Sequence, residues 1–248
     1  MLNKKFFFYS LLFIIFLLAT LPARTALNLL PSNLGLSAKG VSGSIWSGEA
    51  ASVSFNRFTV NNLVWSINPL HLFTGKIGGG VTLENEQMQV AGDWKIGFDS
   101  AVYLSDVEAD VSAKMIEPYL PMRGTRIEGD LKLQLETLEF DPEQGPMAVA
   151  GDIQWRKAAA SIMGPLISLG DFSLRAETSA PGVVELVALP AENVVDLQGS
   201  MTLTWPSMLA VDISVTESVP ESLQSTIAFL QQGPQGRRVF KQELPLRR

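Results

Sequence analysis

The residues that could carry out acid–base or metal chemistry in this chain are few and widely separated. His71 is the only histidine, and there is no cysteine. A zinc site normally needs several His or Cys ligands, and a Ser-His-acid triad would depend on this single imidazole. No Gly-x-Ser-x-Gly motif holds a nucleophile, because Ser44 stands where the last glycine of segment 40–44 is needed. We therefore predict no enzymatic activity, no metal site and no cofactor.

Two short runs imitate ligand-binding loops without meeting their requirements. Asp106, Glu108 and Asp110 alternate as in a calcium loop, but Val111 stands where that loop needs glycine for its sharp turn. The alternation instead predicts a strand with one solvent-exposed face. The glycine-rich run 75–80 lacks the Lys-Ser or Lys-Thr pair of a phosphate loop, so we expect a flexible turn or bulge there.

Composition and charge favour a mainly β protein that does not bind nucleic acid. The chain has 248 residues, of which 46% are apolar, which is enough for a folded domain. Beyond Arg24 it holds 16 Lys and Arg against 25 Asp and Glu, and a surface of that sign does not attract a polyanion. Aliphatic residues alternate with Ser, Thr, Asn and Asp, and this period of two is typical of strands.

A glycine at the start of an alternating apolar run recurs along the chain and predicts a series of similar β units. Each copy places the glycine beside a short polar residue, as in a turn or bulge that leads into a strand. The five copies span residues 39–48, 90–94, 127–131, 149–155 and 197–201. Their order suggests a degenerate duplication. We therefore expect two β halves, residues 25–122 and 123–248, after an N-terminal segment of residues 1–24.

Three further elements are predicted from local patterns. Residues 58–67 read as a hairpin with Asn61 and Asn62 in its turn, because Asn tolerates positive φ. The Ser218 to Glu221 pattern resembles a capping box and predicts a short amphipathic helix that ends near Gly233. Residues 236–246 could form a last strand, which Pro245 would confine to a sheet edge. The five tryptophans lie in or beside strand patterns, and we expect them to be buried rather than to stack on a ligand.

The N-terminus carries a strongly apolar run of 16 residues that follows Lys4 and Lys5. A cleavable signal peptide would need a small-x-small site, but Leu21 occupies one of those positions, so we favour an uncleaved membrane anchor. The two lysines would keep the short N-terminus in the cytoplasm. The anchor residues are Phe6, Phe7, Phe8, Leu11, Leu12, Phe13, Ile14, Ile15, Phe16, Leu17 and Leu18.

After this apolar run, the order of several short motifs resembles the N subunit of the type II secretion system, also called general secretion pathway protein N. Residues 41–50 resemble that family's Gly-Thr-x-Trp-x-Gly-x-Ala motif, with Ser44 in place of the usual threonine. Residues 63–75 resemble its Leu-x-Trp-x-x-x-Pro segment, and residues 151–155 its second Trp element. The residues that carry the resemblance, which we expect to be structural, are Gly43, Trp46, Gly48, Trp65, Pro69, Gly151 and Trp155.

The resemblance implies a non-enzymatic inner-membrane protein with one membrane pass and a periplasmic β domain. It would support export of folded proteins across the outer membrane together with other secretion components. A scaffolding role is then expected, with docking through an exposed strand edge or face. A second hypothesis is a periplasmic lipid-binding or lipid-transfer protein with a curved β groove. A continuous apolar concave face would favour the second hypothesis, and a core filled by tryptophans the first.

Overall fold

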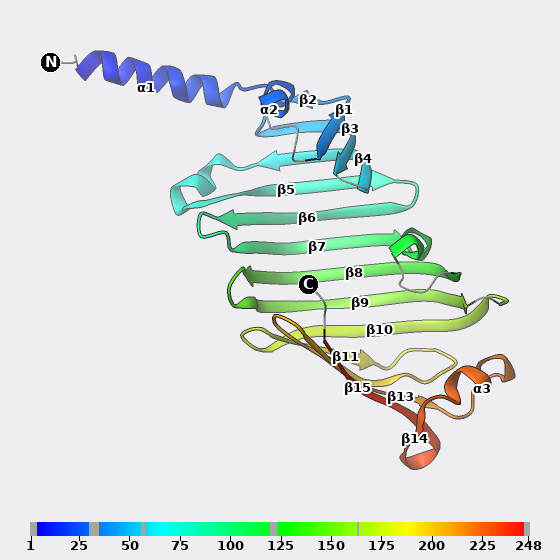
Figure 1. Cartoon of the computed structure of the whole chain (residues 1–248). Helices are drawn as coiled ribbons and strands as arrows, with labels where there is room; N and C mark the ends of the chain where they lie inside the picture. Colours follow the sequence, from blue (N-terminus) through cyan, green and yellow to red (C-terminus); the bar gives the residue numbers. More distant parts are fainter. Residues whose placement is uncertain (1–3, 30–34, 56–57, 120–123, 163, 246–248) are drawn as a thin grey trace. The chain divides into compact units, whose positions relative to one another are not determined.

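The computed structural model describes residues 4–29, 35–55, 58–119, 124–162 and 164–245. The chain forms two compact units, Met1–Asn85 and Glu86–Arg248. Both are built mainly of antiparallel strands, as the sequence predicted (Figure 1). The repeat boundary expected between residues 122 and 123 falls within residues 120–123, which lie outside the described residues, and it stays a prediction.

Unit 1 begins with helices α1 (Lys4–Ala19) and α2 (Ala23–Leu29). The run of helix-compatible apolar residues after Lys5 forms α1 over the residues expected of the anchor, and their side chains are exposed where they are described. Within the described ranges, the structure contains no helix with enough length and apolar character to cross a membrane.

The strands of unit 1 pair in the order β1-β3-β4-β5, and β2 pairs with β3. The elements are β1 (Leu36–Lys39), β2 (Ser42–Gly43), β3 (Ser47–Phe55), β4 (Phe58–Ile67), the 3₁₀ turn η2 (Pro69–Thr74) and β5 (Lys76–Asn85). The hairpin turn predicted at Asn61 and Asn62 is wrong, because β4 runs through both residues. Asn62 does adopt positive φ (54°), and its side-chain amide donates to the Glu84 carbonyl oxygen. Asn62 therefore has the positive φ that the sequence indicates, but it has it inside a strand and not in a turn.

The described residues of unit 2 form ten strands in one antiparallel sheet that follows chain order from β6 to β13 and ends β13-β15-β14 (Figure 1). The strands are β6 (Met88–Gly97), β7 (Val102–Ser112), β8 (Thr125–Asp141), β9 (Gly145–Ile162), β10 (Ile167–Ala180), β11 (Val183–Leu189), β12 (Gln198–Thr204), β13 (Met208–Thr216), β14 (Gln231–Gln232) and β15 (Arg237–Pro245). The 3₁₀ turns η3 (Ala113–Tyr119) and η4 (Pro234–Gly236) and the helix α3 (Glu221–Ile227) complete the unit.

One side of the unit 2 sheet is apolar from β6 to β15. The strand registers place apolar residues directly opposite one another, and opposite residues share a face. This apolar face consists of Met88, Val90, Val107, Ala109, Val111, Leu131, Leu133, Leu135, Ile153, Trp155, Phe172, Leu174, Ala176, Val184, Leu186, Ala188, Met201, Leu203, Leu209, Val211, Ile213, Phe240 and Leu244. The opposite face carries most of the charged residues, among them Glu108 and Asp110, as the alternation around residue 106 predicted.

The unit 2 sheet curls strongly at one end. The rings of Phe140, at the end of β8, and Trp205, directly after β12, lie 5.1 Å apart in an edge-to-face contact, although three strands separate β8 from β12. The Gly182 amide donates to the Pro146 carbonyl oxygen (2.8 Å), and the Trp205 amide to the Gly182 carbonyl oxygen (2.7 Å). Phe140 lies two residues from Leu138, which faces Val149 on the apolar side, so the sheet curls towards its apolar face.

No large side chain among the described residues is fully buried. The five tryptophans are half-buried, so the prediction that they fill a buried core is wrong. A single sheet layer covers each side chain only by its neighbours on the same face, which explains this partial burial.

The predicted C-terminal helix is present as α3, but two of its predicted features are wrong. Ser218 does not cap it. Pro220 precedes the first turn and makes no side-chain cap bond, and the Ser218 amide instead donates to Thr216 Oγ1. The helix ends at Ile227 rather than near Gly233. Its apolar side is used as expected, since Leu223 is buried together with Val219.

Candidate functional site

The residues tested for chemistry in the sequence do not converge in space. No group of three or more His, Asp or Glu side chains in the described ranges could hold a metal ion. Asp110 pairs with Arg156, and Glu117 accepts the Ile127 amide (2.7 Å), so both carboxylates serve the fold. The glycine-rich run is not a flexible turn: Gly75 caps η2 and residues 76–80 begin β5.

Trp46 joins the N-terminal helix to the sheet of unit 1. Its indole Nε1 donates to the Leu18 carbonyl oxygen (2.9 Å), one of the last carbonyl groups of α1, which also accepts the Leu21 amide (3.4 Å). Close by, the Ile45 amide donates to the Leu21 carbonyl oxygen (3.1 Å), and Pro22 forms a β-bridge with Ser44. Residues 41–50, the first of the motifs described above, therefore hold the end of α1 against the strands of unit 1 by hydrogen bonds.

The glycines of this motif allow the backbone and the Trp65 indole to approach closely at these contacts. Gly43 has φ of 86°, and a Cβ there would lie 2.4 Å from the Ser47 carbonyl oxygen. Gly48 lies opposite Trp65 in the β3–β4 ladder, and a Cβ on Gly48 would meet the indole ring at 2.5 Å. The Trp65 indole crosses Gly48 and donates to the Ile45 carbonyl oxygen (3.2 Å).

Pro69 begins η2, a short turn that its own residues hold in place. The Asn68 side chain accepts the Leu70 amide (3.0 Å), Thr74 Oγ1 donates to the His71 carbonyl oxygen (2.8 Å), and Gly75 closes the turn in a left-handed conformation. The strand end before this turn is bonded to Trp46, whose carbonyl oxygen accepts the Ile67 amide (2.5 Å) at the end of β4.

Gly151 and Trp155 lie on β9 in unit 2. A Cβ on Gly151 would lie 2.6 Å from the Gln134 carbonyl oxygen. The Trp155 indole donates to the Glu128 carbonyl oxygen (3.0 Å) and stacks on Phe172. Like Trp65, Trp155 therefore bonds a backbone carbonyl near a positive-φ glycine, here Gly129 at 114°.

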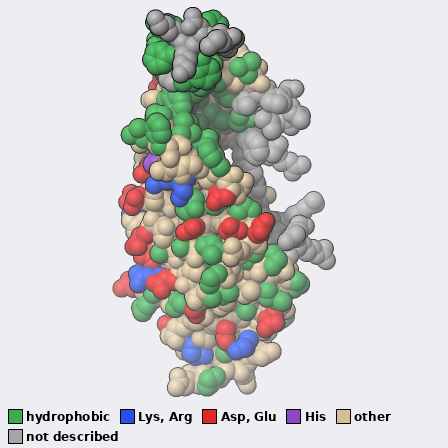
Figure 2. Space-filling model, turned by 90° about the vertical axis from the view of Figure 1, so that its left-hand side faces the viewer, with side chains coloured by type: hydrophobic (Ala, Val, Ile, Leu, Met, Phe, Trp, Pro, Cys, Tyr) green, Lys and Arg blue, Asp and Glu red, His purple; other side chains and the backbone are tan. Residues whose placement is uncertain are grey.

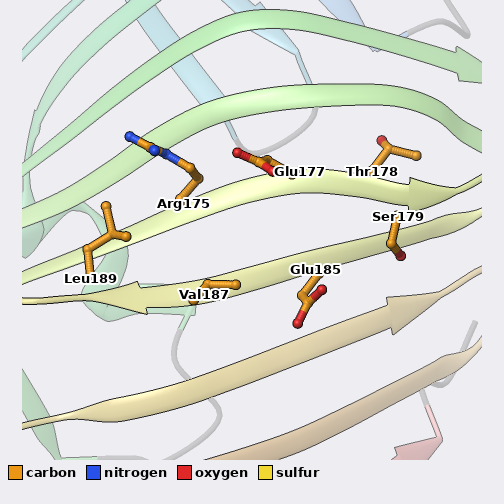
Figure 3. Close-up of a pocket in the computed structure, with 7 residues that line it drawn as sticks. All are labelled: Arg175, Glu177, Thr178, Ser179, Glu185, Val187 and Leu189. Carbon is orange, nitrogen blue, oxygen red and sulfur yellow. The ribbon is translucent and has the colours of Figure 1, made fainter.

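A hollow of about 250 Å³ lies on the charged face of unit 2, over β10 and β11 (Figure 3). Arg175 lies along it and forms two bonds to Asp152, which raise the pKa of the guanidinium further above its ordinary range. Glu177 lies directly opposite Glu185 across the strands. The arrangement offers no nucleophile beside a base, so it supports no catalytic step.

The last strand leaves part of the sheet edge without a described neighbour. β14 pairs only with Arg238 and Val239, so no described strand covers the outer side of β15 from Phe240 to Pro245. Residues 241–245 are exposed. Pro245 lies in this edge strand, as predicted.

Sequence reasoning missed the contact of Phe140 with Trp205 and the exposed apolar residues of η2. The first joins residues 65 positions apart across three intervening strands, and no local pattern encodes such a contact. The exposed apolar residues of η2 could have been found from the sequence, because Leu70, Leu72 and Phe73 follow directly after Pro69.

Three comparisons place the chain among known proteins. Residues 34–241 match the family described as "Type II secretion system (T2SS), protein N". The chain is 25% identical over 246 residues to the type II secretion system protein N of Vibrio cholerae serotype O1, covering 95% of this chain and 96% of that protein. It is 26% identical over 167 residues to the protein of the same name from Aeromonas hydrophila, covering 64% of each. No solved structure matches.

Proposed function

Because the chain belongs to the type II secretion system protein N family, it is a non-catalytic protein-transport component of the cell envelope, and we propose that it acts as a membrane-attached scaffold. In this proposal α1 holds the chain at the inner membrane with its other residues in the periplasm. The sheet of unit 2 then docks another secretion component at its β15 edge.

The apolar surface of α1 supports membrane attachment. Its Phe, Leu and Ile side chains point outwards all round the helix and are exposed, and such a helix is stable only in a protein core or in lipid. Its 16 residues span about 24 Å at a rise of 1.5 Å each, against a hydrocarbon thickness of about 30 Å. Local thinning of the bilayer accommodates a short helix at modest cost. Lys4 and Lys5 orient the N-terminus towards the cytoplasm.

The unpaired stretch of β15 is the observation that carries the docking proposal. An open strand edge presents backbone N–H and C=O groups that a strand of another chain can pair with. Residues 240–245 offer such an edge over about two antiparallel bond pairs, and the side chains of Lys241 and Glu243 point away from the apolar face. A partner strand would thus gain main-chain bonds without displacing any described strand.

Two proline variants test this docking. Successive backbone amides of a strand point to opposite sides, so Lys241→Pro and Gln242→Pro remove one donor from the outer edge and one from the β13–β15 ladder. The variant that keeps the stability of unit 2 has lost the outer donor. We expect that variant to lower secretion of exoproteins in cells that carry it as their only copy. Normal secretion with both variants would exclude docking at this edge.

A second candidate function, lipid binding, is favoured by the apolar face of unit 2. The face is continuous across nine strands, β6 to β13 and β15, it curls inwards at Phe140 and Trp205, and its side chains are mostly half-buried. Backbone groups inside the sheet already pair with one another, so an occupant needs no hydrogen bonds. The hydrocarbon chains of a lipid are apolar and form no hydrogen bonds, so they suit this face.

A matched pair of substitutions tests lipid binding. Ala109 lies on the apolar face and Ala91 on the charged face of the neighbouring strand. Native mass spectrometry of the full chain, released from detergent micelles, would count retained phospholipids. Lipid binding at the apolar face predicts that Ala109→Trp loses a retained phospholipid and that Ala91→Trp keeps it. Equal retention in the two variants would exclude the apolar face as the lipid site.

A further inference from the structure

The 3₁₀ turn η2 exposes three large apolar side chains in sequence positions 70–73. Phe73 is 88% exposed, Leu70 66% and Leu72 41%, and no part of the turn is buried. In the space-filling view, the purple atoms of the single histidine, His71, border green apolar atoms on one side and blue and red charged atoms on another (Figure 2). Full exposure of a Phe and a Leu beside each other is costly in water.

The strand that leads into the turn is bonded to the same residue as the end of the apolar helix. Trp46 donates its indole N–H to the Leu18 carbonyl oxygen of α1 and accepts the Ile67 amide through its own carbonyl oxygen. Ile67 is the last residue of β4, and Pro69 begins η2 two residues later. One residue, Trp46, therefore bonds both the end of α1 and the strand end that leads into η2. Tryptophan is also typical of the boundary between membrane and water, where its ring is apolar and its N–H is bonded.

The turn can enter the headgroup region without breaking hydrogen bonds. The Leu70 amide is bonded to Asn68 Oδ1, the His71 amide to the Asn68 carbonyl oxygen (3.2 Å), and the Gly75 amide to the Leu72 carbonyl oxygen (3.2 Å). Backbone groups that are already bonded avoid most of the cost of leaving water. The same bonds hold the apolar side chains outwards.

We propose that η2 is a second membrane contact, in which Leu70, Leu72 and Phe73 insert into the periplasmic leaflet beside the end of α1. The occupant is the lipid surface that receives α1, because Trp46 bonds both the end of α1 and Ile67, two residues before η2 begins. This inference rests on the proposed attachment of α1. Two contacts, a helix and a turn, fix the orientation of unit 1 against the membrane, which a single helix cannot do.

The absence of cysteine allows each site to carry one fluorescent label. The full chain is reconstituted into vesicles of phosphatidylethanolamine and phosphatidylglycerol that contain a nitroxide-labelled phospholipid. A polarity-sensitive dye is placed on His71→Cys for the turn, on Phe13→Cys for α1, and on Asn61→Cys as the control, since Asn61 is exposed on β4 six residues before its end. We expect strong loss of fluorescence to the nitroxide lipid at positions 13 and 71 and little loss at position 61.

The apolar side chains themselves are tested by adding Leu70→Ser and Phe73→Ser to the His71→Cys chain. Losing the burial of two large side chains should lower the membrane-inserted population of the turn by at least about tenfold. Circular dichroism of the same sample checks that the sheet is intact.

The outcomes separate the two proposals. Quenching at position 13 without quenching at position 71 overturns the turn contact and leaves α1 attached. No quenching at position 13 overturns the attachment of α1. A dye at position 71 that is shielded from water but not quenched by the nitroxide lipid shows a protein partner on the turn and also overturns the inference.

Discussion

The contact between Gly48 and Trp65 gives the sharpest quantitative prediction. A Cβ added to Gly48 would lie 2.5 Å from Trp65 Cζ2 and 2.4 Å from the Ser42 carbonyl oxygen. Real Cβ atoms do not approach other atoms so closely, so either the indole or the β2–β3 pairing must move in Gly48→Ala. Its φ is not positive, so the penalty is steric rather than conformational.

The expected size of the effect follows from the costs of overpacking. Forcing an extra carbon into a tightly packed place costs about 1 to 3 kcal/mol. This corresponds to a roughly 5-fold to 150-fold larger equilibrium constant for opening of the β3–β4 pair. Trp65→Phe removes the bond to the Ile45 carbonyl oxygen, worth about 1 kcal/mol, together with part of the apolar contact.

The two substitutions should not be additive. In the double variant the shorter ring of Phe no longer reaches the new Cβ, so only the collision with the Ser42 carbonyl oxygen persists. We expect the double variant to be more stable than the sum of the single effects by at least about 0.5 kcal/mol. The sign of this coupling depends on the indole crossing Gly48.

Hydrogen exchange of the full chain in detergent micelles measures the local stability of the β3–β4 pair in each variant. Peptides from residues 47–67 report on β3 and β4, and peptides from residues 149–162 in unit 2 serve as the internal reference. The single variants should speed up exchange in the first set and leave the second unchanged. Strict additivity, or unchanged exchange in Gly48→Ala, would refute the proposed packing of Trp65 over Gly48.

Three further predictions concern other contacts. Trp46→Phe should raise exchange at the end of α1 by about fivefold, since the bond to Leu18 is worth about 1 kcal/mol. The hydrogen bond from Arg237 holds the pKa of Asp196 below its ordinary value of 3.8, so this contact stabilises the fold above that pH and is lost as the pH falls through the lowered pKa. Exchange of β15 should therefore rise in strong acid, and Asp196→Asn should remove that dependence. Gly129→Ala, at φ of 114° and against a backbone carbonyl, should lower the melting temperature of unit 2, measured by circular dichroism, by about 2 to 12 °C.

Much of the fold could be predicted because strand alternation is a local signal. The pattern around residue 106 placed Val107, Ala109 and Val111 on one face, and they do line the apolar face. The motif order from Trp46 to Trp155 identified the family. Glycine spacing also marked special backbone positions, such as Gly129.

The failures share a physical cause. Asn62 signals positive φ, but positive φ occurs in a bulge inside a strand as well as in a turn. The prediction of a core filled by tryptophans is wrong because periodicity does not show whether a second layer of structure covers a face of the sheet. Curling at Phe140 and Trp205 depends on four successive strand pairings from β8 to β12, which no short window of sequence contains.

Site-specific photo-crosslinking in secreting cells tests the docking account most directly. A photoreactive amino acid replaces Glu243 on the β15 edge, and Glu177, exposed on central strand β10, serves as the control. The scaffold account predicts that position 243 crosslinks to another type II secretion component and that position 177 does not. Equal crosslinking from both positions, or none from position 243 in cells that secrete normally, would contradict it.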